Sequence, residues 1–296
     1  METVTTELNI NREYLNSSGH ILVGSTAKTH CKLFYEIYGE GPKKIAFLNG
    51  MGTDRQMWEL LVQYFAPKKD YQILVYDHRG TGYSEDCAML SITTLQMAKD
   101  ANDVLEFLKW DKEINIVGIS MGGMIAQELG LLVPGKIKTI TLCSTTSGWT
   151  LYKKSAVIMN IRMLMTKVQE EQIDLVLNIL YPKGFRRKLK NTRIHGMSSI
   201  VGQTLAVLRH RVSDKSLNIL GELFPSRRIW IVVGTWDNFI PENDSHCLAK
   251  QIGNDSSVLD VFEGAGHSIP TQNFDQFVKK LQLIVDAGQV PLTTSD

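Results

Sequence analysis

The sequence has few cysteines, and their spacing matches no common metal or redox motif. The four in its 296 residues are Cys31, Cys87, Cys143 and Cys247, with no C-x-x-C pair among them. Cysteines this far apart support neither a disulfide framework nor a zinc site. We therefore expect four reduced thiols and no bound metal.

Long apolar runs and an excess of one charge are also missing. No stretch reaches the about 18 apolar residues that a membrane-spanning helix needs. The net charge is only +1, whereas a domain that binds nucleic acid through its phosphates usually carries a basic excess. The first ten residues lack the basic start and apolar run of a signal peptide. These absences predict a cytoplasmic protein that binds no nucleic acid, and they leave its oligomeric state open.

The sequence does contain short apolar runs that alternate with helical patterns. Runs typical of strands lie at residues 33–38, 45–48, 73–76, 114–119, 137–143, 229–233 and 258–262. Helical patterns lie at residues 56–65, 95–110, 121–133 and 272–287. This alternation predicts an α/β fold, with a mostly parallel central sheet and helices on both faces. The first two runs are expected to form an antiparallel edge.

One stretch interrupts the alternation. Residues 149–225 have no strong strand signal, and Met, Leu, Ile, Lys and Arg recur there at helical spacing. We interpret this stretch as an insertion of about four helices between two strands of the sheet. The core would then comprise residues 1–148 and 226–296.

The pattern G-x-S-x-G occurs around Ser120, from Gly118 to Gly122. It follows a strand-like run and precedes a helical pattern, which is the setting that a nucleophile elbow requires. Such a turn holds the serine hydroxyl at a helix N-terminus, where negative charge is favoured. We therefore predict that Ser120 is a nucleophile, the alternative being a serine in an ordinary turn.

A serine hydroxyl needs a base, and the base needs a carboxylate that orients it. His267 stands in a glycine-rich loop after the run at 258–262, and Asp237 follows the run at 229–233. The resulting order of Ser, Asp and His is the one found with this elbow. We predict His267 as the base and Asp237 as its partner. Asp260 is the nearest rival for Asp237, but it lies inside a strand pattern.

An acyl intermediate also needs donors for its oxyanion. The residue after the nucleophile, Met121, would supply one backbone N–H, and the loop after the run at 45–48 would supply the other. That loop, residues 49–52, contains two glycines that allow a close approach of the backbone. We assign the second donor to Met51, the alternative being a plain glycine turn.

These segments together resemble the α/β-hydrolase superfamily, in its cap-bearing branch of serine hydrolases. The matching segments, in chain order, are residues 49–52, 77–84, 118–122, the loop around Asp237, and residues 264–267. Residues 77–84 resemble the D-x-R-G-x-G-x-S turn, which is mostly structural in relatives. One departure is Asn49, because many relatives carry His at that position.

The resemblance implies that the insertion is a cap over the active site. Its residues Trp149, Met159 and Met163 are then candidates for the substrate pocket, although packing between cap and core is an alternative role for either methionine. A basic run at 186–193 is short, which favours a solvated surface over contact with anionic lipid.

The serine at the elbow also narrows the chemistry. Epoxide hydrolases and haloalkane dehalogenases of this fold place Asp there, so acyl transfer to serine is expected instead. We predict a hydrolase of a carboxylic ester, lactone or thioester with a mainly apolar acyl part, which needs no cofactor. Two alternatives are a hydrolase of C–C bonds in diketone-type substrates and a ligand receptor with only residual hydrolysis.

Overall fold

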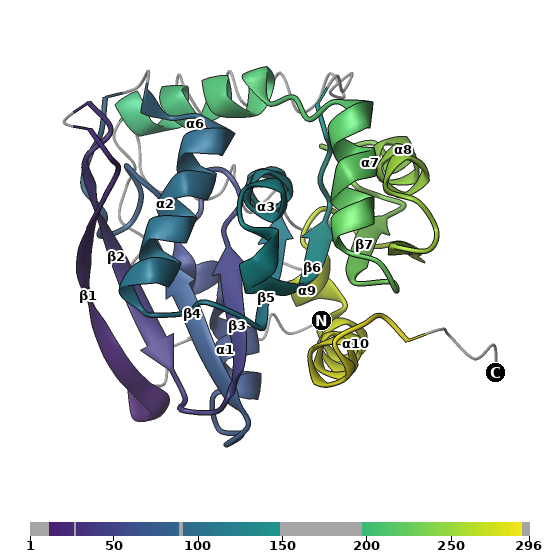
Figure 1. Ribbon diagram of the computed structural model, residues 1–296, viewed down its shortest axis with the longest axis horizontal. Helices are drawn as coiled ribbons and strands as arrows, with labels where there is room; N and C mark the ends of the chain where they lie inside the picture. Colours follow the sequence, from purple (N-terminus) through teal and green to yellow (C-terminus); the bar gives the residue numbers. More distant parts are fainter. Residues whose placement is uncertain (1–11, 27, 89–90, 149–196, 292–296) are drawn as a thin grey trace, which may run out of the picture.

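A single mixed sheet forms the centre of the molecule (Figure 1). The computed structural model describes residues 12–26, 28–88, 91–148 and 197–291. Within them the sheet has eight strands in the order β1-β2-β4-β3-β5-β6-β7-β8. The strands are β1 (Leu15–Val23), β2 (Cys31–Tyr38), β3 (Lys43–Leu48), β4 (Tyr71–Tyr76), β5 (Ile114–Ile119), β6 (Ile137–Cys143), β7 (Ile229–Gly234) and β8 (Ser257–Phe262). Strands β3 to β8 are parallel, which confirms the mostly parallel sheet.

The antiparallel edge differs from the prediction. It consists of β1 and β2, and β2 is also antiparallel to β4. The run at 45–48 belongs instead to β3, a central strand that lies parallel between β4 and β5. Strand β1 was missed because its sequence, LNSSGHILV, is largely polar and alternates between exposed and partly buried positions. The central place of β3 puts the loop after it next to the loop after β5.

Helices cover both faces of the sheet, as predicted (Figure 1). Residues of α2, α3, α7 and α8 share one core cluster with the sheet, and residues of α1, α9 and α10 share the other. The helices are α1 (Glu59–Phe65), α2 (Thr94–Phe107), α3 (Met121–Leu132), α6 (Met197–Arg209), α7 (Asp214–Leu223), α8 (Glu242–Ile252), α9 (Ile269–Gln272) and α10 (Phe274–Ala287). Short 3-10 turns occupy Arg12–Tyr14, Arg55–Trp58 and Pro134–Lys136.

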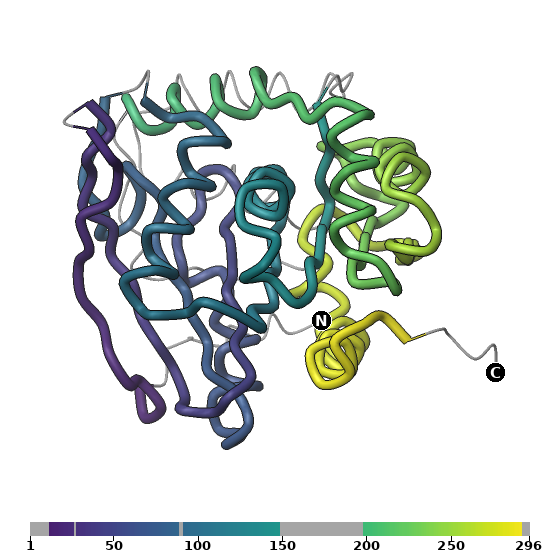
Figure 2. The backbone as a smooth tube through the Cα atoms, viewed as in Figure 1, coloured from purple at the N-terminus to yellow at the C-terminus, as the bar shows by residue number. Residues whose placement is uncertain are grey.

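Of the predicted insertion, helices α6 and α7 fall within the described residues. Helix α6 lies across the top of the molecule in Figure 2, at the end toward which β3 and β5 run. Helix α7 packs into the core through Leu217 and Leu220. Its Gly221 is so close to α8 that a Cβ there would lie 2.0 Å from the Ile252 carbonyl oxygen. The extent of the insertion stays a prediction.

The prediction of four reduced thiols is wrong. Cys31 and Cys87 form a disulfide, while Cys143 and Cys247 are free. The two bonded residues are 56 positions apart, so their spacing gave no signal. Backbone pairing brings them together, because the Glu85 N–H donates to the Lys32 carbonyl at 2.8 Å. Disulfides are rare in the cytosol, so this bond does not support the predicted cytoplasmic location.

Candidate active site

Ser120 occupies a sharp turn between β5 and α3. Its backbone angles are φ 55° and ψ −118°, a conformation that L-residues rarely adopt. Two hydrogen bonds hold the turn, from the Ser120 N–H to the Cys143 carbonyl at 2.9 Å and from the Thr145 hydroxyl to the Ser120 carbonyl at 2.7 Å. Gly122 has no room for a side chain, because a Cβ would lie 2.1 Å from the Leu48 carbonyl oxygen. This strand, sharp turn and helix match the geometry that a nucleophile elbow requires.

His267 and Asp237 are joined by a hydrogen bond. His267 Nδ1 lies 2.8 Å from Asp237 Oδ2, and both residues are buried. The other carboxylate oxygen of Asp237 accepts the backbone N–H groups of Phe239 at 2.8 Å and Ile240 at 3.0 Å. A carboxylate fixed in this way favours the tautomer with the proton on Nδ1 of His267. The other ring nitrogen, Nε2, can then accept a proton.

Three predicted residues meet at one end of the sheet. Ser120 follows β5, Asp237 follows β7 and His267 follows β8, so all three lie at the carboxyl ends of parallel strands. Between the described side chains of Ser120 and His267 the structure contains no hydrogen bond. Such contacts often tighten only when substrate is bound.

Asp260, the rival of Asp237, has a different role. Its carboxylate accepts the indole N–H of Trp230 at 2.8 Å and also contacts the Lys280 ammonium. The Asp260 side chain therefore links β8 to β7 and α10, and it does not orient His267.

The two predicted oxyanion donors belong to segments that lie next to Ser120. Met121 is the first residue of α3, and the first N–H groups of a helix have no partner within it. The loop of Met51 approaches from β3, since a Cβ on Gly50 would lie 3.6 Å from Ser120 Cβ. The two loops are thus so close that one added carbon on Gly50 would bring them into van der Waals contact beside Ser120.

Asn49 has a structural role at the start of this loop. Its buried side chain accepts the Trp58 indole N–H at 2.8 Å and donates to the Tyr76 carbonyl at 2.8 Å. The Asn49 carbonyl lies 3.2 Å from Nε2 of His78. Burial lowers the pKa of His78 to about 4, so this imidazole is neutral at pH 7. Asn49 therefore fixes the end of β3 without reaching into the site.

The turn at residues 77–84 is a buried network of charges. The Asp77 carboxylate accepts hydrogen bonds from the Arg55 guanidinium at 2.8 Å and from the Tyr83 N–H at 2.9 Å. Burial raises the pKa of Asp77 to about 6, although the Arg55 charge opposes that rise. In the same turn, Nε of Arg79 donates to a carboxylate oxygen of Asp100 at 2.6 Å. These contacts tie the turn to its surroundings, in line with the structural role that the resemblance implies.

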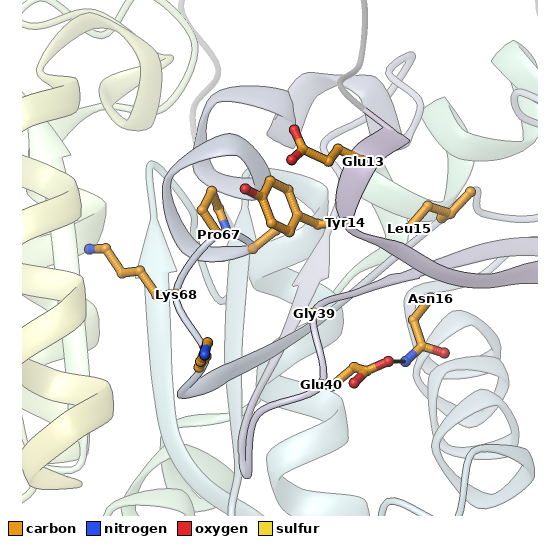
Figure 3. Close-up of a pocket in the computed structure, with 10 residues that line it drawn as sticks. Glu13, Tyr14, Leu15, Asn16, Gly39, Glu40, Pro67 and Lys68 are labelled. Atoms are coloured by element: carbon orange, nitrogen blue, oxygen red, sulfur yellow. Dashed lines mark hydrogen bonds between the residues drawn. The ribbon is translucent and has the colours of Figure 1, made fainter.

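The predicted pocket residues belong to the part of the chain that the structure does not describe. Trp149, Met159 and Met163 lie outside the described residues, as does the basic run at 186–193. A separate cavity of about 530 Å³ lies at the opposite end of the sheet, between the start of β1 and the turn before β4 (Figure 3). Two of its polar lining residues bond to each other, Asn16 to Glu40 at 3.1 Å. This cavity is remote from Ser120.

Two residues that no motif signalled contact the site. The Phe239 ring lies 5.1 Å from the His267 ring, centroid to centroid. At the loop that carries Met51, Gln203 of α6 accepts a hydrogen bond from the backbone N–H of Gly52 at 2.9 Å. Phe239 could have been suspected from its place two residues after Asp237, whereas nothing in the sequence singles out Gln203.

His210, directly after α6, is buried as a neutral side chain. Its Nδ1 lies 3.0 Å from the Thr94 hydroxyl and 3.8 Å from a Glu128 carboxylate oxygen. Burial, with a smaller contribution from the Arg211 charge, lowers the pKa of His210 from 6.5 to about 3. The unfolded chain therefore binds a proton here below pH 6.5 that the folded chain does not. The stability that His210 contributes is complete above pH 6.5 and is lost as the pH falls toward 3.

We expect His210→Asn to flatten the acid dependence of stability. Between pH 6.5 and 4.5 the wild-type free energy of unfolding should fall relative to the variant by about 1.4 kcal/mol per pH unit. Urea unfolding at several pH values measures this difference. Thr94→Val, which keeps the imidazole, should retain the wild-type slope, and parallel curves for wild type and His210→Asn would contradict the prediction.

Two kinds of feature are absent from the described ranges. No helix there is long and apolar enough to cross a membrane. Nor do three or more His, Cys, Asp or Glu side chains in that part of the chain gather as metal ligands.

Comparisons with known proteins agree on the fold. A family model described as alpha/beta hydrolase fold matches residues 45–215. The 3-oxoadipate enol-lactonase 1 of Acinetobacter baylyi is 36% identical over 113 residues, 38% of this chain, and the chain spans only 40% of that relative's length. The structure of an esterase from Thermogutta terrifontis has a TM-score of 0.73 at 20% identity, over 92% of this chain and 99% of that one. An enol-lactonase from Burkholderia xenovorans gives 0.69 at 22% identity, over 86% and 97%. At these identities the two structures show the fold alone.

Proposed function

Since the chain belongs to the α/β-hydrolase fold family, we propose that it is a serine hydrolase whose triad is Ser120, His267 and Asp237. The substrate would be a carboxylic ester, lactone or thioester. The observation that carries the proposal is the buried 2.8 Å bond between His267 and Asp237, at the same end of the sheet as the strained Ser120. The name of one relative, an enol-lactonase that is 36% identical over 38% of this chain, supports a lactone or a related ester.

The proposed reaction follows from the positions of these groups. Ser120 Oγ attacks the substrate carbonyl and gives its proton to Nε2 of His267, while Asp237 stabilises the imidazolium. The N–H groups of Met51 and Met121 bind the oxyanion, and each such donor is typically worth about 10²–10³ in kcat. His267 then protonates the leaving group and activates the water that releases the acid. No cofactor takes part.

Two further proposals, on the acyl part of the substrate and on nucleic acid, come from the sequence alone. A mainly apolar acyl part is proposed from the methionines of the insertion, among them Met159 and Met163, which lie outside the described residues. The absence of nucleic acid among its partners is proposed from the net charge of +1.

A fluorophosphonate probe tests the nucleophile. The probe should add one phosphonyl group per chain, and peptide mapping by mass spectrometry should place it on Ser120. His267→Ala should slow the labelling by orders of magnitude, because the hydroxyl then lacks its base. An unlabelled wild-type chain that is correctly folded, or an adduct on another serine, would refute the proposal.

A C–C hydrolase could use the same triad, so labelling alone does not identify the substrate. Incubation with an aryl ester and with a vinylogous 1,5-diketone, followed by product analysis, separates the two. The proposal expects acid and alcohol from the ester at a much higher kcat/KM than any cleavage of the diketone. The reverse preference would favour the C–C hydrolase.

A further inference from the structure

Two hydrogen bonds fix the peptide groups of the loop that carries Met51. The first involves the peptide between Gly50 and Met51. The buried hydroxyl of Thr53 donates to the Gly50 carbonyl at 2.9 Å. In a planar trans peptide the C=O and N–H point in opposite directions. The Thr53 bond therefore directs the Met51 N–H away from Thr53 and prevents that peptide from rotating.

The second bond fixes the next peptide, between Met51 and Gly52. Its N–H, on Gly52, donates to Oε1 of Gln203 at 2.9 Å. Gly52 has φ +69°, a left-handed conformation that glycine adopts without strain. Glycine is also the residue whose backbone dihedral angles change most easily. A hydrogen bond to the Gly52 N–H therefore restricts a backbone rotation that the loop would otherwise allow.

Gln203 is well placed to act as such an anchor. The residue is 1% exposed, and its amide nitrogen lies 3.5 Å from the Ser199 hydroxyl, one turn earlier on α6. Ser199 in turn packs on the turn at 77–84, since a Cβ on Gly80 would lie 2.7 Å from its hydroxyl oxygen. Helix α6 therefore rests on two of the loops at this end of the sheet.

We propose that Gln203 is a positioning residue for the oxyanion hole: its amide oxygen holds the Gly52 N–H and so keeps the Met51 N–H aimed at the oxyanion. The inference rests on the proposed function. Toward the loop, Gln203 bonds the backbone N–H of Gly52, and among the described residues no hydrogen bond joins it to Ser120 or His267. Its effect is therefore on the transition state, where the Met51 donor is used, and not on substrate binding. Through this bond, the position of the oxyanion donors depends on how α6, a helix of the predicted insertion, packs on the core.

The test compares variants that keep or remove the acceptor. Gln203→Met has a similar length but no oxygen, so kcat for a p-nitrophenyl ester should fall roughly 10- to 100-fold, with KM within about threefold. Affinity for an alkyl trifluoromethyl ketone, which forms an oxyanion on serine, should fall by the same factor. Gln203→Glu keeps an acceptor and should retain most of the kcat. Ile200→Val, which trims a buried apolar side chain of α6 and leaves the contacts of Gln203 in place, is the matched control and should stay close to wild type.

The outcomes distinguish this inference from the proposed function. If Gln203→Met has wild-type kcat and inhibitor affinity, or if it changes KM alone, the inference is overturned. An equal loss in Ile200→Val would assign the effect to helix packing and would also overturn the inference. Should Gln203→Met not fold, a loss of tenfold or more in folded Gln203→Glu would contradict the inference. Absence of turnover by the wild type would instead refute the proposed function.

Discussion

Ser120→Ala is expected to lower kcat for p-nitrophenyl esters by about 10⁴- to 10⁶-fold, because no other group can form the acyl-enzyme. The fold should survive the change. Alanine keeps the Cβ, and both hydrogen bonds that hold the turn involve the backbone of residue 120, to Cys143 and from Thr145. Residual activity would come from the oxyanion donors and substrate binding alone.

Ser144→Ala is the matched control for this variant. Ser144 is also buried, also has a positive φ of 45°, and has no hydrogen-bond partner for its hydroxyl. Its removal should leave kcat within about twofold of wild type, since no bond of the site is lost. Activity of Ser120→Ala within tenfold of wild type would exclude Ser120 as the nucleophile.

Asp237→Asn is expected to lower kcat by about 10⁴-fold with little change in KM. The amide oxygen of Asn can still accept the N–H groups of Phe239 and Ile240, so the loop should keep its shape. The amide nitrogen would then face Nδ1 of His267. Because that nitrogen is a donor, it favours the tautomer with the proton on Nε2, which cannot accept the serine proton. Initial rates over a substrate range measure both constants.

Asp260→Asn separates this effect from a general loss of a carboxylate. Asp260 lies on the neighbouring strand β8 but bonds to Trp230 and Lys280. Its substitution should lower thermal stability and leave kcat within about threefold of wild type. A comparable loss of kcat in both variants would contradict the assignment of Asp237 to the triad.

Much of the fold could be predicted because its central strands are buried on both faces. Strand β5 is buried at each position, so it stands out as a continuous apolar run. The exposed edge gives no such signal, and β1, with Ser17, Ser18 and Gly19, was missed. The pairing of β2 with β4 was also missed, because strand order depends on contacts between distant segments.

The candidate site shows the same division between local and distant information. The turn at Ser120 was predictable because its glycines and flanking elements are consecutive in the chain. Asp237 and His267 were predicted from their places after successive strands, and the structure joins them by a hydrogen bond. The bond from Gly52 to Gln203 spans 151 positions, and the disulfide of Cys31 and Cys87 spans 56. Neither has a local pattern, so only the folded chain reveals them.

Hydrolysis of esters through Ser120 is the prediction on which the other proposed roles depend. Turnover of a p-nitrophenyl acyl series, from acetate to long chains, by wild type beside Ser120→Ala tests it most directly. We expect catalytic turnover by the wild type, an optimum at one acyl length, and loss of turnover in the variant. No turnover on any chain length by a correctly folded wild type, or equal rates for the two proteins, would contradict it.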